Sequence, residues 1–112
     1  MIEVDNKQDL DAELAKSKRV IALFYAQWCP HCVRFVPIFN RKIATLPKVD
    51  VVHVLMDDFD SPLWDDFSVD AVPTIILFEN GVVCSRLDGR LGLGLSESAF
   101  LAWLEKIKNG CG

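Results

Sequence analysis

The 112-residue sequence lacks any apolar run that approaches the roughly 20 residues of a membrane-spanning helix. Its first ten residues, MIEVDNKQDL, have neither the basic start nor the long apolar core of a secretory signal, so we expect a cytoplasmic protein without a membrane anchor. Positive charge is also scarce. The formal net charge is −4, which argues against nucleic-acid binding because phosphate contacts require a basic patch. The chain has no repeats, low-complexity tracts or interdomain linker.

Apolar and charged residues make up 51% and 25% of the chain, which is ordinary for a globular protein. We expect residues 1–112 to form a single domain, large enough to fold without structural disulfides or metals. Four cysteines are present, at Cys29, Cys32, Cys84 and Cys111. Persistent disulfides are rare in the cytoplasm, where a CxxC pair is more typical of catalysis or metal binding. We therefore expect Cys84 to be a small core residue of a strand and Cys111 to be frayed and exposed.

Hydrophobic patterning predicts an alternation of strands and helices. Five segments are expected to be strands: Ile2–Asp5, Arg19–Ala26, Val49–Met56, Pro73–Phe78 and Val82–Leu87. Helices are expected after a cap at Asn6 or Asp9, after the CxxC pair, within residues 57–69 and after an N-cap at Ser96. Asn80-Gly81 predicts a hairpin between the last two strands. The order β-α-β-α-β-α-β-β-α predicts an α/β protein with a central mixed sheet and helices on both faces.

The stretch FYAQWCPHC, residues 24–32, carries the chemistry. Cys29 and Cys32 are three residues apart and would share one face at the start of a helix. The unpaired N–H groups and dipole of a helix N-terminus favour a thiolate. We therefore assign Cys29 as the exposed nucleophile and Cys32 as the buried resolving thiol, with His31 adding a positive charge or a hydrogen bond to the thiolate. Two other interpretations are half of a zinc site and a pair of inert core thiols.

The sequence resembles the thioredoxin family from about Asp5 to Lys108. The resemblance rests on WCPHC after an apolar strand, on Pro37 five residues later, on Val72-Pro73-Thr74 and on the spacing to LFENG and Asp88-Gly89. It implies the thioredoxin fold, a cis bond before Pro73 and thiol–disulfide exchange. The implied substrate-binding residues are Trp28, Pro30, Val72, Pro73 and Gly89. From sequence alone, Pro73 could instead be an ordinary proline at the start of a strand.

The sequence also departs from thioredoxin proper. Pro-His stands between the cysteines, as in periplasmic disulfide oxidases, and the loop Arg90 to Leu95 looks about four residues longer. The resemblance places Leu23 and Val54 where thioredoxins bury an aspartate and a lysine, so we expect an apolar floor beneath Cys32. It also places Asp58 where it could hold the indole N–H of Trp28. We interpret His53 as a satisfied strand histidine.

These observations predict a thiol–disulfide oxidoreductase that acts on protein disulfides. The expected partners are protein substrates and a thioredoxin-reductase-type electron donor. We expect a monomer that needs no cofactor and no metal and binds neither nucleic acid nor membrane. One alternative is a glutaredoxin-like, glutathione-dependent reductase, which the lack of a cationic cluster near Val72 makes a weaker interpretation. The other is a thioredoxin-fold binding module with vestigial cysteines, which the retained Cys29, Cys32 and Val72-Pro73 argue against.

Overall fold

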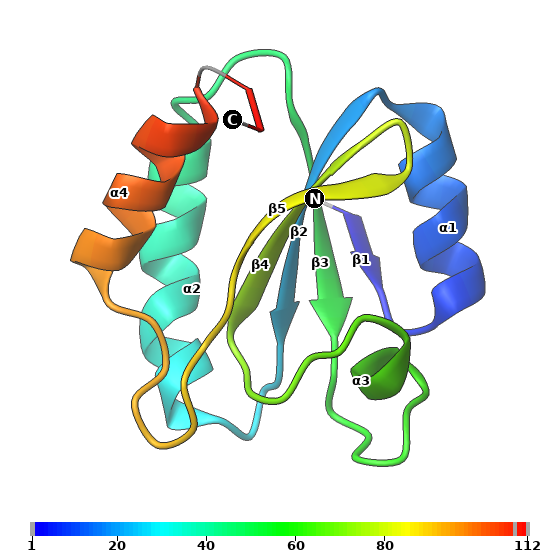
Figure 1. Cartoon of the computed structure of the whole chain (residues 1–112). Coiled ribbons are helices and arrows are strands. Elements are labelled where there is room, and N and C mark those ends of the chain that lie inside the picture. The colour runs from blue at the N-terminus through cyan, green and yellow to red at the C-terminus, as the bar shows by residue number, and fades with distance from the viewer. Residues whose placement is uncertain (1, 109, 112) are drawn as a thin grey trace.

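A five-stranded mixed sheet forms the centre of the computed structural model, which describes residues 2–108 and 110–111 (Figure 1). The strands are β1 (Ile2–Val4), β2 (Arg19–Tyr25), β3 (Asp50–Leu55), β4 (Thr74–Glu79) and β5 (Val82–Leu87). Their spatial order is β1-β3-β2-β4-β5. β1, β3 and β2 are parallel to one another, β4 is antiparallel to β2, and β5 is antiparallel to β4. The predicted α/β fold class and element order are confirmed.

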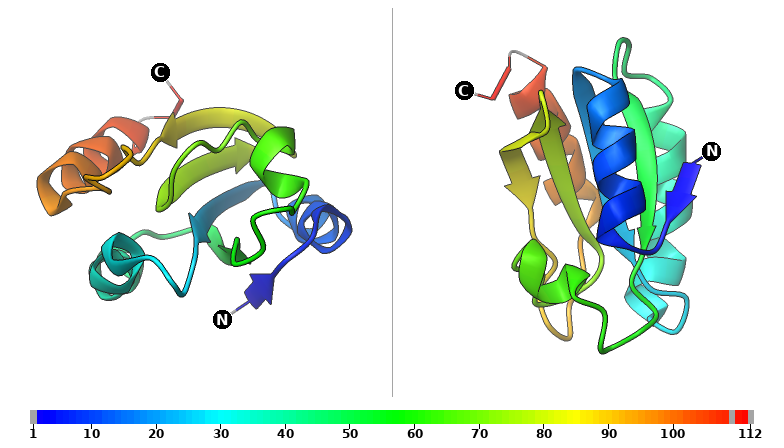
Figure 2. Two further views of the ribbon diagram at one scale, coloured as in Figure 1. Left: turned by 90° about the horizontal axis from the view of Figure 1, so that it is seen from below. Right: turned by 90° about the vertical axis from the view of Figure 1, so that its right-hand side faces the viewer.

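Helices cover both faces of this sheet. They are α1 (Lys7–Lys16), α2 (Pro30–Ile43), α3 (Leu63–Asp66) and α4 (Glu97–Ile107). Figure 2 shows α2 and α4 on one face and α1 and α3 on the other. None of the helices in the described part of the chain has the length and apolarity that crossing a membrane requires.

Local sequence signals explain where the elements begin and turn. The Asn6 side chain accepts a hydrogen bond from the N–H of Asp9 at 2.8 Å, so Asn6 is the cap of α1. Ser96 caps α4 in the same way, by accepting from the N–H of Ala99 at 3.1 Å. Asn80 and Gly81 have φ of 53° and 80° and form the tight hairpin between β4 and β5.

The central strand β2 is buried on both faces and separates two hydrophobic clusters. Val20, Ala22 and Phe24 pack on the α1 side, in the cluster that also contains Cys29 and Cys32. Ile21 and Leu23 pack on the α2 and α4 side, with Phe35, Phe39, Phe100 and Trp103. The continuous apolar run in the sequence therefore supplies both cores from one strand.

The prediction that Leu23 and Val54 together form an apolar floor beneath Cys32 is wrong. The register of β2 and β3 sets Leu23 beside His53 and Phe24 beside Val54. Residues next to each other along a strand point to opposite faces, so Leu23 and Val54 lie on different sides of the sheet. Val54 packs in the same cluster as Cys32, whereas Leu23 packs in the other cluster.

The expectation for Cys111 is wrong, and the expectation for Cys84 is confirmed only in its place in a strand packed against the core. Cys84 is a half-buried residue of β5, and Cys111 is not frayed but joined to it in a disulfide. Sequence spacing did not predict the pair because 27 residues separate the two cysteines. Their contact depends on α4 packing back against the sheet.

Candidate active site

The CxxC pair lies where β2 gives way to α2. Cys29 is the N-cap of α2 and has an extended backbone, and Pro30 occupies the first turn. Proline suits that position because the first N–H groups of a helix have no partner within it, so a residue without an N–H loses no hydrogen bond there. The Cys29 carbonyl accepts from the N–H groups of Cys32 and Val33 at 3.0 and 3.1 Å, which closes the first turn. The helix thus begins with its positive end at Cys29.

The two thiols, which are free of each other in this structure, have different surroundings. Cys32 is 1% exposed, and its sulfur accepts a long contact of 3.4 Å from the N–H of Ala26. Burial raises the pKa of the Cys32 thiol to about 12, so this thiol is protonated at neutral pH. Cys29 is 7% exposed, which is less than expected for a nucleophile, although its side chain lines an open pocket.

The loop before β4 covers the Cys29 sulfur. The bond between Val72 and Pro73 is cis, as predicted, and the Val72 carbonyl oxygen lies 3.7 Å from Cys29 Sγ. This contact is why Cys29 is less exposed than expected. The same carbonyl is a backbone acceptor placed beside the reacting sulfur.

Gly89 is fixed by its contact with this loop. A Cβ at Gly89 would lie 2.2 Å from the Pro73 carbonyl oxygen, a distance that no side chain tolerates. The N–H of Gly89 also donates to Thr74 Oγ1 at 3.1 Å, and that hydroxyl donates to the Ala71 carbonyl at 2.7 Å. A glycine is therefore needed for β5 to end against the Pro73 loop.

A pocket of about 450 Å³ opens beside Cys29. Of the residues predicted to bind substrate, Trp28 and Val72 line it, whereas Pro30, Pro73 and Gly89 do not. Its remaining lining, apart from Cys29 and His31, comes from three loops and α3: Phe59, Trp64, Asp70, Ala71, Arg90, Leu91 and Gly92.

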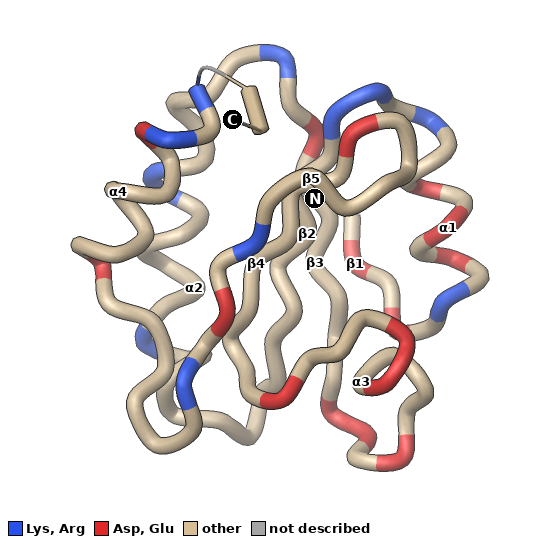
Figure 3. The backbone as a smooth tube through the Cα atoms, in the orientation of Figure 1, with Lys and Arg blue, Asp and Glu red and all other residues tan. Residues whose placement is uncertain are grey.

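Phe59 is the main pocket residue that sequence reasoning missed. It stacks on Trp28 with ring centroids 4.7 Å apart and is 73% exposed. Its signal in the sequence is a single aromatic residue inside the acidic run Asp57 to Asp60. Acidic residues continue through this loop and α3, at the same end of the sheet as the start of α2 (Figure 3). The rim of the pocket is therefore acidic and its lining mostly apolar.

The predicted contact between Asp58 and Trp28 is wrong. The Trp28 indole N–H donates to the backbone carbonyl of Asp57 at 3.0 Å. The carbonyl of Asp58 accepts instead from the indole of Trp64, also at 3.0 Å. Both indoles are thus fixed by backbone oxygens of the loop after β3, and no carboxylate is used.

His31 has a side chain fixed from two directions. The Arg34 guanidinium lies 3.1 Å from His31 Nδ1. A guanidinium can only donate, so Nδ1 accepts and the imidazole carries its proton on Nε2. Gly94 approaches from the other side, where a Cβ would lie 2.7 Å from the His31 Cβ and 2.9 Å from its Cγ. The long loop after β5 therefore packs directly on the active-site histidine.

Possible metal ligands gather elsewhere. Within residues 2–108 and 110–111, the one group of at least three close ligand atoms joins Glu79, Cys84 and Cys111. It does not include Cys29 or Cys32, so the sulfur pair at the start of α2 is best described by thiol chemistry.

A dithiol at the N-terminus of a helix, beside a cis-proline loop at one end of the central strands of a mixed sheet, defines a thiol–disulfide oxidoreductase. The thioredoxin family model matches residues 1–104, and the chain belongs to the thioredoxin family. It is 30% identical over 101 residues to a thioredoxin of Chlamydia pneumoniae, covering 90% of this chain and 92% of that protein. It is 35% identical over 82 residues to the chloroplastic thioredoxin Y1 of Arabidopsis thaliana, covering 72% of this chain and 47% of that protein.

Solved structures give the same result. The structure of a thioredoxin from Plasmodium falciparum superimposes with a TM-score of 0.78 at 26% sequence identity. The match covers 96% of this chain and 99% of that one. The predicted thioredoxin fold and thiol–disulfide oxidoreductase activity are therefore confirmed, and thioredoxins as a class exchange disulfides with proteins and with reductase partners.

Proposed function

We propose that this chain is a monomeric, single-domain enzyme that reduces protein disulfides in the cytoplasm and is recharged by a thioredoxin-reductase-type donor. Cys29 is the nucleophile, Cys32 the resolving thiol and His31 a modulator of the thiolate. Trp28, Pro30, Val72, Pro73 and Gly89 form the surface that meets the substrate.

The observation that carries the proposal is the difference between the two thiols. Cys29 lines the pocket at the positive end of α2, whereas Cys32 is covered and its pKa is raised to about 12 by burial. In the first step, the Cys29 thiolate attacks one sulfur of a substrate disulfide and the other sulfur leaves as a thiolate. A mixed disulfide between Cys29 and the substrate results.

In the second step, Cys32 gives up its proton and attacks Cys29 Sγ. The substrate leaves as its second thiolate, and Cys29 and Cys32 become a disulfide. Two electrons have passed to the substrate. Because Cys32 is surrounded by apolar groups, its proton is transferred to water only when the mixed disulfide is in place, or to His31 Nδ1 once that nitrogen has released Arg34.

Protein substrates are favoured over glutathione by the surface around Cys29. Trp28, Phe59 and Leu91 are exposed apolar side chains at the pocket, and exposed apolar patches are typical of protein contact sites. Arg90 is the one cation among the lining residues, and Asp70 offsets it. Glutathione has two carboxylates and one amine, so the acidic rim does not suit it.

Two assays with one protein preparation test this proposal. We expect reduction of insulin disulfides when the protein is coupled to NADPH and a thioredoxin reductase. We expect little turnover when it is coupled to glutathione, glutathione reductase and a small mixed disulfide of glutathione. The Cys29→Ser variant is the inactive control. Turnover with glutathione alone would favour the glutaredoxin-like interpretation, and inactivity in both assays would favour a binding module.

A further inference from the structure

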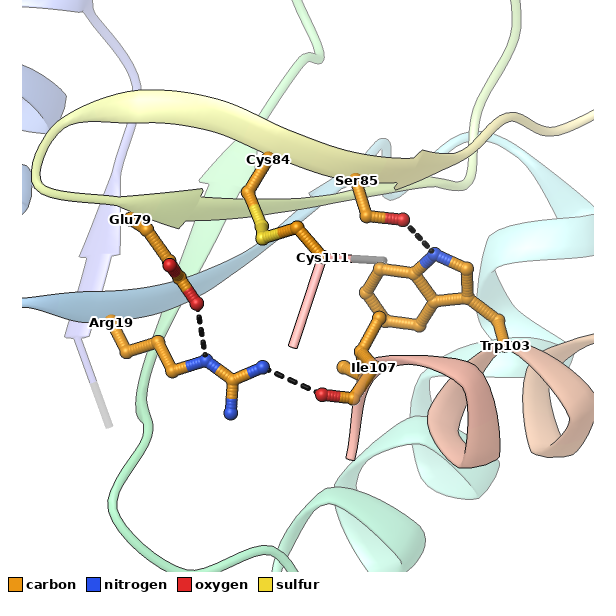
Figure 4. Close-up of a disulfide and its surroundings, with 7 residues drawn as sticks. All are labelled: Arg19, Glu79, Cys84, Ser85, Trp103, Ile107 and Cys111. Carbon is orange, nitrogen blue, oxygen red and sulfur yellow. Dashed lines mark hydrogen bonds and ion pairs between the residues drawn. A yellow bond between two sulfur atoms is a disulfide. The ribbon is translucent and has the colours of Figure 1, made fainter. Parts of the chain in front are cut away.

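A second pair of cysteines lies outside the active site. Cys84 and Cys111 are joined in a disulfide with Cα atoms 5.5 Å apart, inside the usual range for such bonds (Figure 4). Both residues are partly exposed, so a reagent can reach them from solvent. The reaction at Cys29 and Cys32 does not use this pair.

The second pair is at the opposite end of the sheet from Cys29. Cys84 is near the hairpin between β4 and β5, and at this end of the sheet β4 pairs with the Arg19 end of β2. Cys29 follows the other end of β2, after Tyr25. The two ends of the seven-residue strand β2 are about 20 Å apart, because a strand rises roughly 3.3 Å from one residue to the next. Figure 1 agrees, since the end of α4 and the start of α2 lie at opposite ends of the molecule. Exchange between the two pairs must therefore join two copies of the chain.

The fold brings Cys84 and Cys111 together independently of the bond between them. The Trp103 indole in α4 donates to Ser85 Oγ in β5 at 3.0 Å. Arg19 holds the end of α4 by donating through Nη2 to the Ile107 carbonyl at 2.7 Å. The reduced thiols would thus remain neighbours, which makes closing the disulfide favourable.

Charge also favours the disulfide at this site. A Glu79 carboxylate oxygen and the two sulfurs all lie within 4.8 Å of one another. A thiolate here would face a like charge, which the Arg19 ion pair at 3.0 Å offsets only in part. Cys29 has the opposite surroundings, because the N-terminus of α2 favours its thiolate. A thiolate is thus less stabilised at Cys84 and Cys111 than at Cys29, which makes the Cys29–Cys32 disulfide the stronger oxidant of the two.

We propose that Cys84 and Cys111 are a second redox site, and that the Cys29–Cys32 disulfide of another copy of the chain oxidises it. The identity of the oxidant rests on the proposed function, whereas the existence of the second site does not. A thiolate of the Cys84/Cys111 pair attacks Cys29 Sγ, and Cys32 leaves as a thiolate and takes up a proton. The remaining thiol of the pair, on losing its proton, attacks the mixed disulfide and displaces Cys29. Two electrons thereby pass to the second copy, which becomes the dithiol.

Two complementary variants test the transfer. The recipient is Cys29→Ser/Cys32→Ser, reduced and freed of reductant. The donor is Cys84→Ser/Cys111→Ser with an oxidised active site and a tag that changes its mass. After mixing in equal amounts and quenching with acid, maleimide labelling counts the thiols on each chain. We expect the recipient to lose two thiols as the donor gains two, with an equilibrium constant of at least 10, which corresponds to about 30 mV for a two-electron couple.

Two further measurements separate the possible failures. The donor is assayed for insulin reduction. A donor that reduces insulin but leaves the recipient reduced would overturn the transfer and leave the proposed function intact. The recipient is also titrated in glutathione redox buffers, where we expect an intramolecular disulfide. Its absence at every ratio would overturn the second redox site. A donor that neither reduces insulin nor oxidises the recipient would overturn both the proposed function and the transfer.

The Glu79→Gln recipient tests the charge argument. Near pH 10, where free thiols are ionised, removing the like charge should stabilise the reduced pair and lower the equilibrium constant for disulfide formation about threefold to tenfold. The Glu97→Gln recipient is the matched control, since Glu97 is the first residue of α4, at the opposite end of that helix from Cys111, and its ion pair is with Arg41 of α2. Equal constants for both variants would contradict a role of Glu79 in this site.

Discussion

His53 lies directly beside Leu23 in the parallel pairing of β3 and β2, on the sheet face that α2 covers. His53 Nε2 is 3.1 Å from Asn40 Oδ1, and because that oxygen can only accept, Nε2 carries the proton. Nδ1 is buried without a hydrogen-bond partner among the described residues, so His53 is only half satisfied and the expectation from sequence is wrong in this respect. The ring packs edge-to-face against Tyr25 and Phe39.

The first prediction is that His53 makes the protein less stable in mild acid. Burial lowers the pKa of His53 below its usual value of 6.5, with Glu3 acting in the opposite direction. The unfolded chain therefore binds a proton before the folded chain does as the pH falls. The free energy of unfolding should be highest above about pH 7 and should decrease as the pH falls below about 6.5, by at most about 1.4 kcal/mol per pH unit.

Urea unfolding at several pH values between 7.5 and 5 checks this. The His53→Gln variant keeps a donor for Asn40 and does not titrate, so its stability should change much less over this range. The His31→Gln variant is the control, because it removes the other histidine of the chain and keeps His53. If wild type and His53→Gln lose stability in parallel, another group causes the decrease.

The second prediction uses two glycines of the loop after β5. Gly92 and Gly94 both have positive φ, of 76° and 70°, but only a Cβ at Gly94 would collide with His31. Gly92→Ala should cost about 1–2 kcal/mol of stability for its backbone conformation alone. Gly94→Ala should cost about 1–3 kcal/mol more through overpacking and should also shift the reduction potential of the Cys29–Cys32 pair. Unfolding curves and redox titration of both variants measure these effects. If Gly94→Ala and Gly92→Ala have the same reduction potential, the loop does not position His31.

Some of this arrangement follows from sequence and some does not. Apolar runs, Asn80-Gly81 and the caps at Asn6 and Ser96 are local signals, and they predicted the element order. The cis bond before Pro73 was predicted from its neighbours in the family motif. Strand register is not a local property, because it depends on which residue of β3 meets Leu23. The sequence-based alignment set Val54 beside Leu23, one position away from the true neighbour His53. An error of one position along a strand moves the assigned side chain to the opposite face of the sheet.

The disulfide and the pocket show the same limit. Cys84 and Cys111 meet because Trp103 and Arg19 dock α4 on the sheet, through contacts between residues 18 and 88 positions apart in the chain. Phe59 lines the pocket because its loop folds over Trp28. In the sequence it is an aromatic residue among aspartates, with no motif that links it to the cysteines.

The third prediction concerns the potential of the active-site pair. The His31→Leu variant should have a more negative reduction potential, by about 30 mV for each tenfold loss of thiolate stabilisation. The Arg34→Met variant removes the donor to His31 Nδ1 and leaves the imidazole in place. Redox titration of the three proteins against glutathione separates the roles. If His31→Leu matches wild type, the helix N-terminus alone sets the potential, and the assigned role of His31 is wrong.

The last prediction is the difference in behaviour of the two active-site thiols. Cys29 is at the start of α2 and lines the pocket, so Cys32→Ser should still attack substrates but fail to resolve the mixed disulfide. Covalent adducts should accumulate on non-reducing gels after incubation with cell extract. Cys29→Ser should form almost none, because burial covers Cys32 and raises the pKa of its thiol to about 12. Equal adduct yields from the two variants would reverse the assignment. A Cys29→Ser/Cys32→Ser protein gives the background, and adducts on it would come from Cys84 or Cys111.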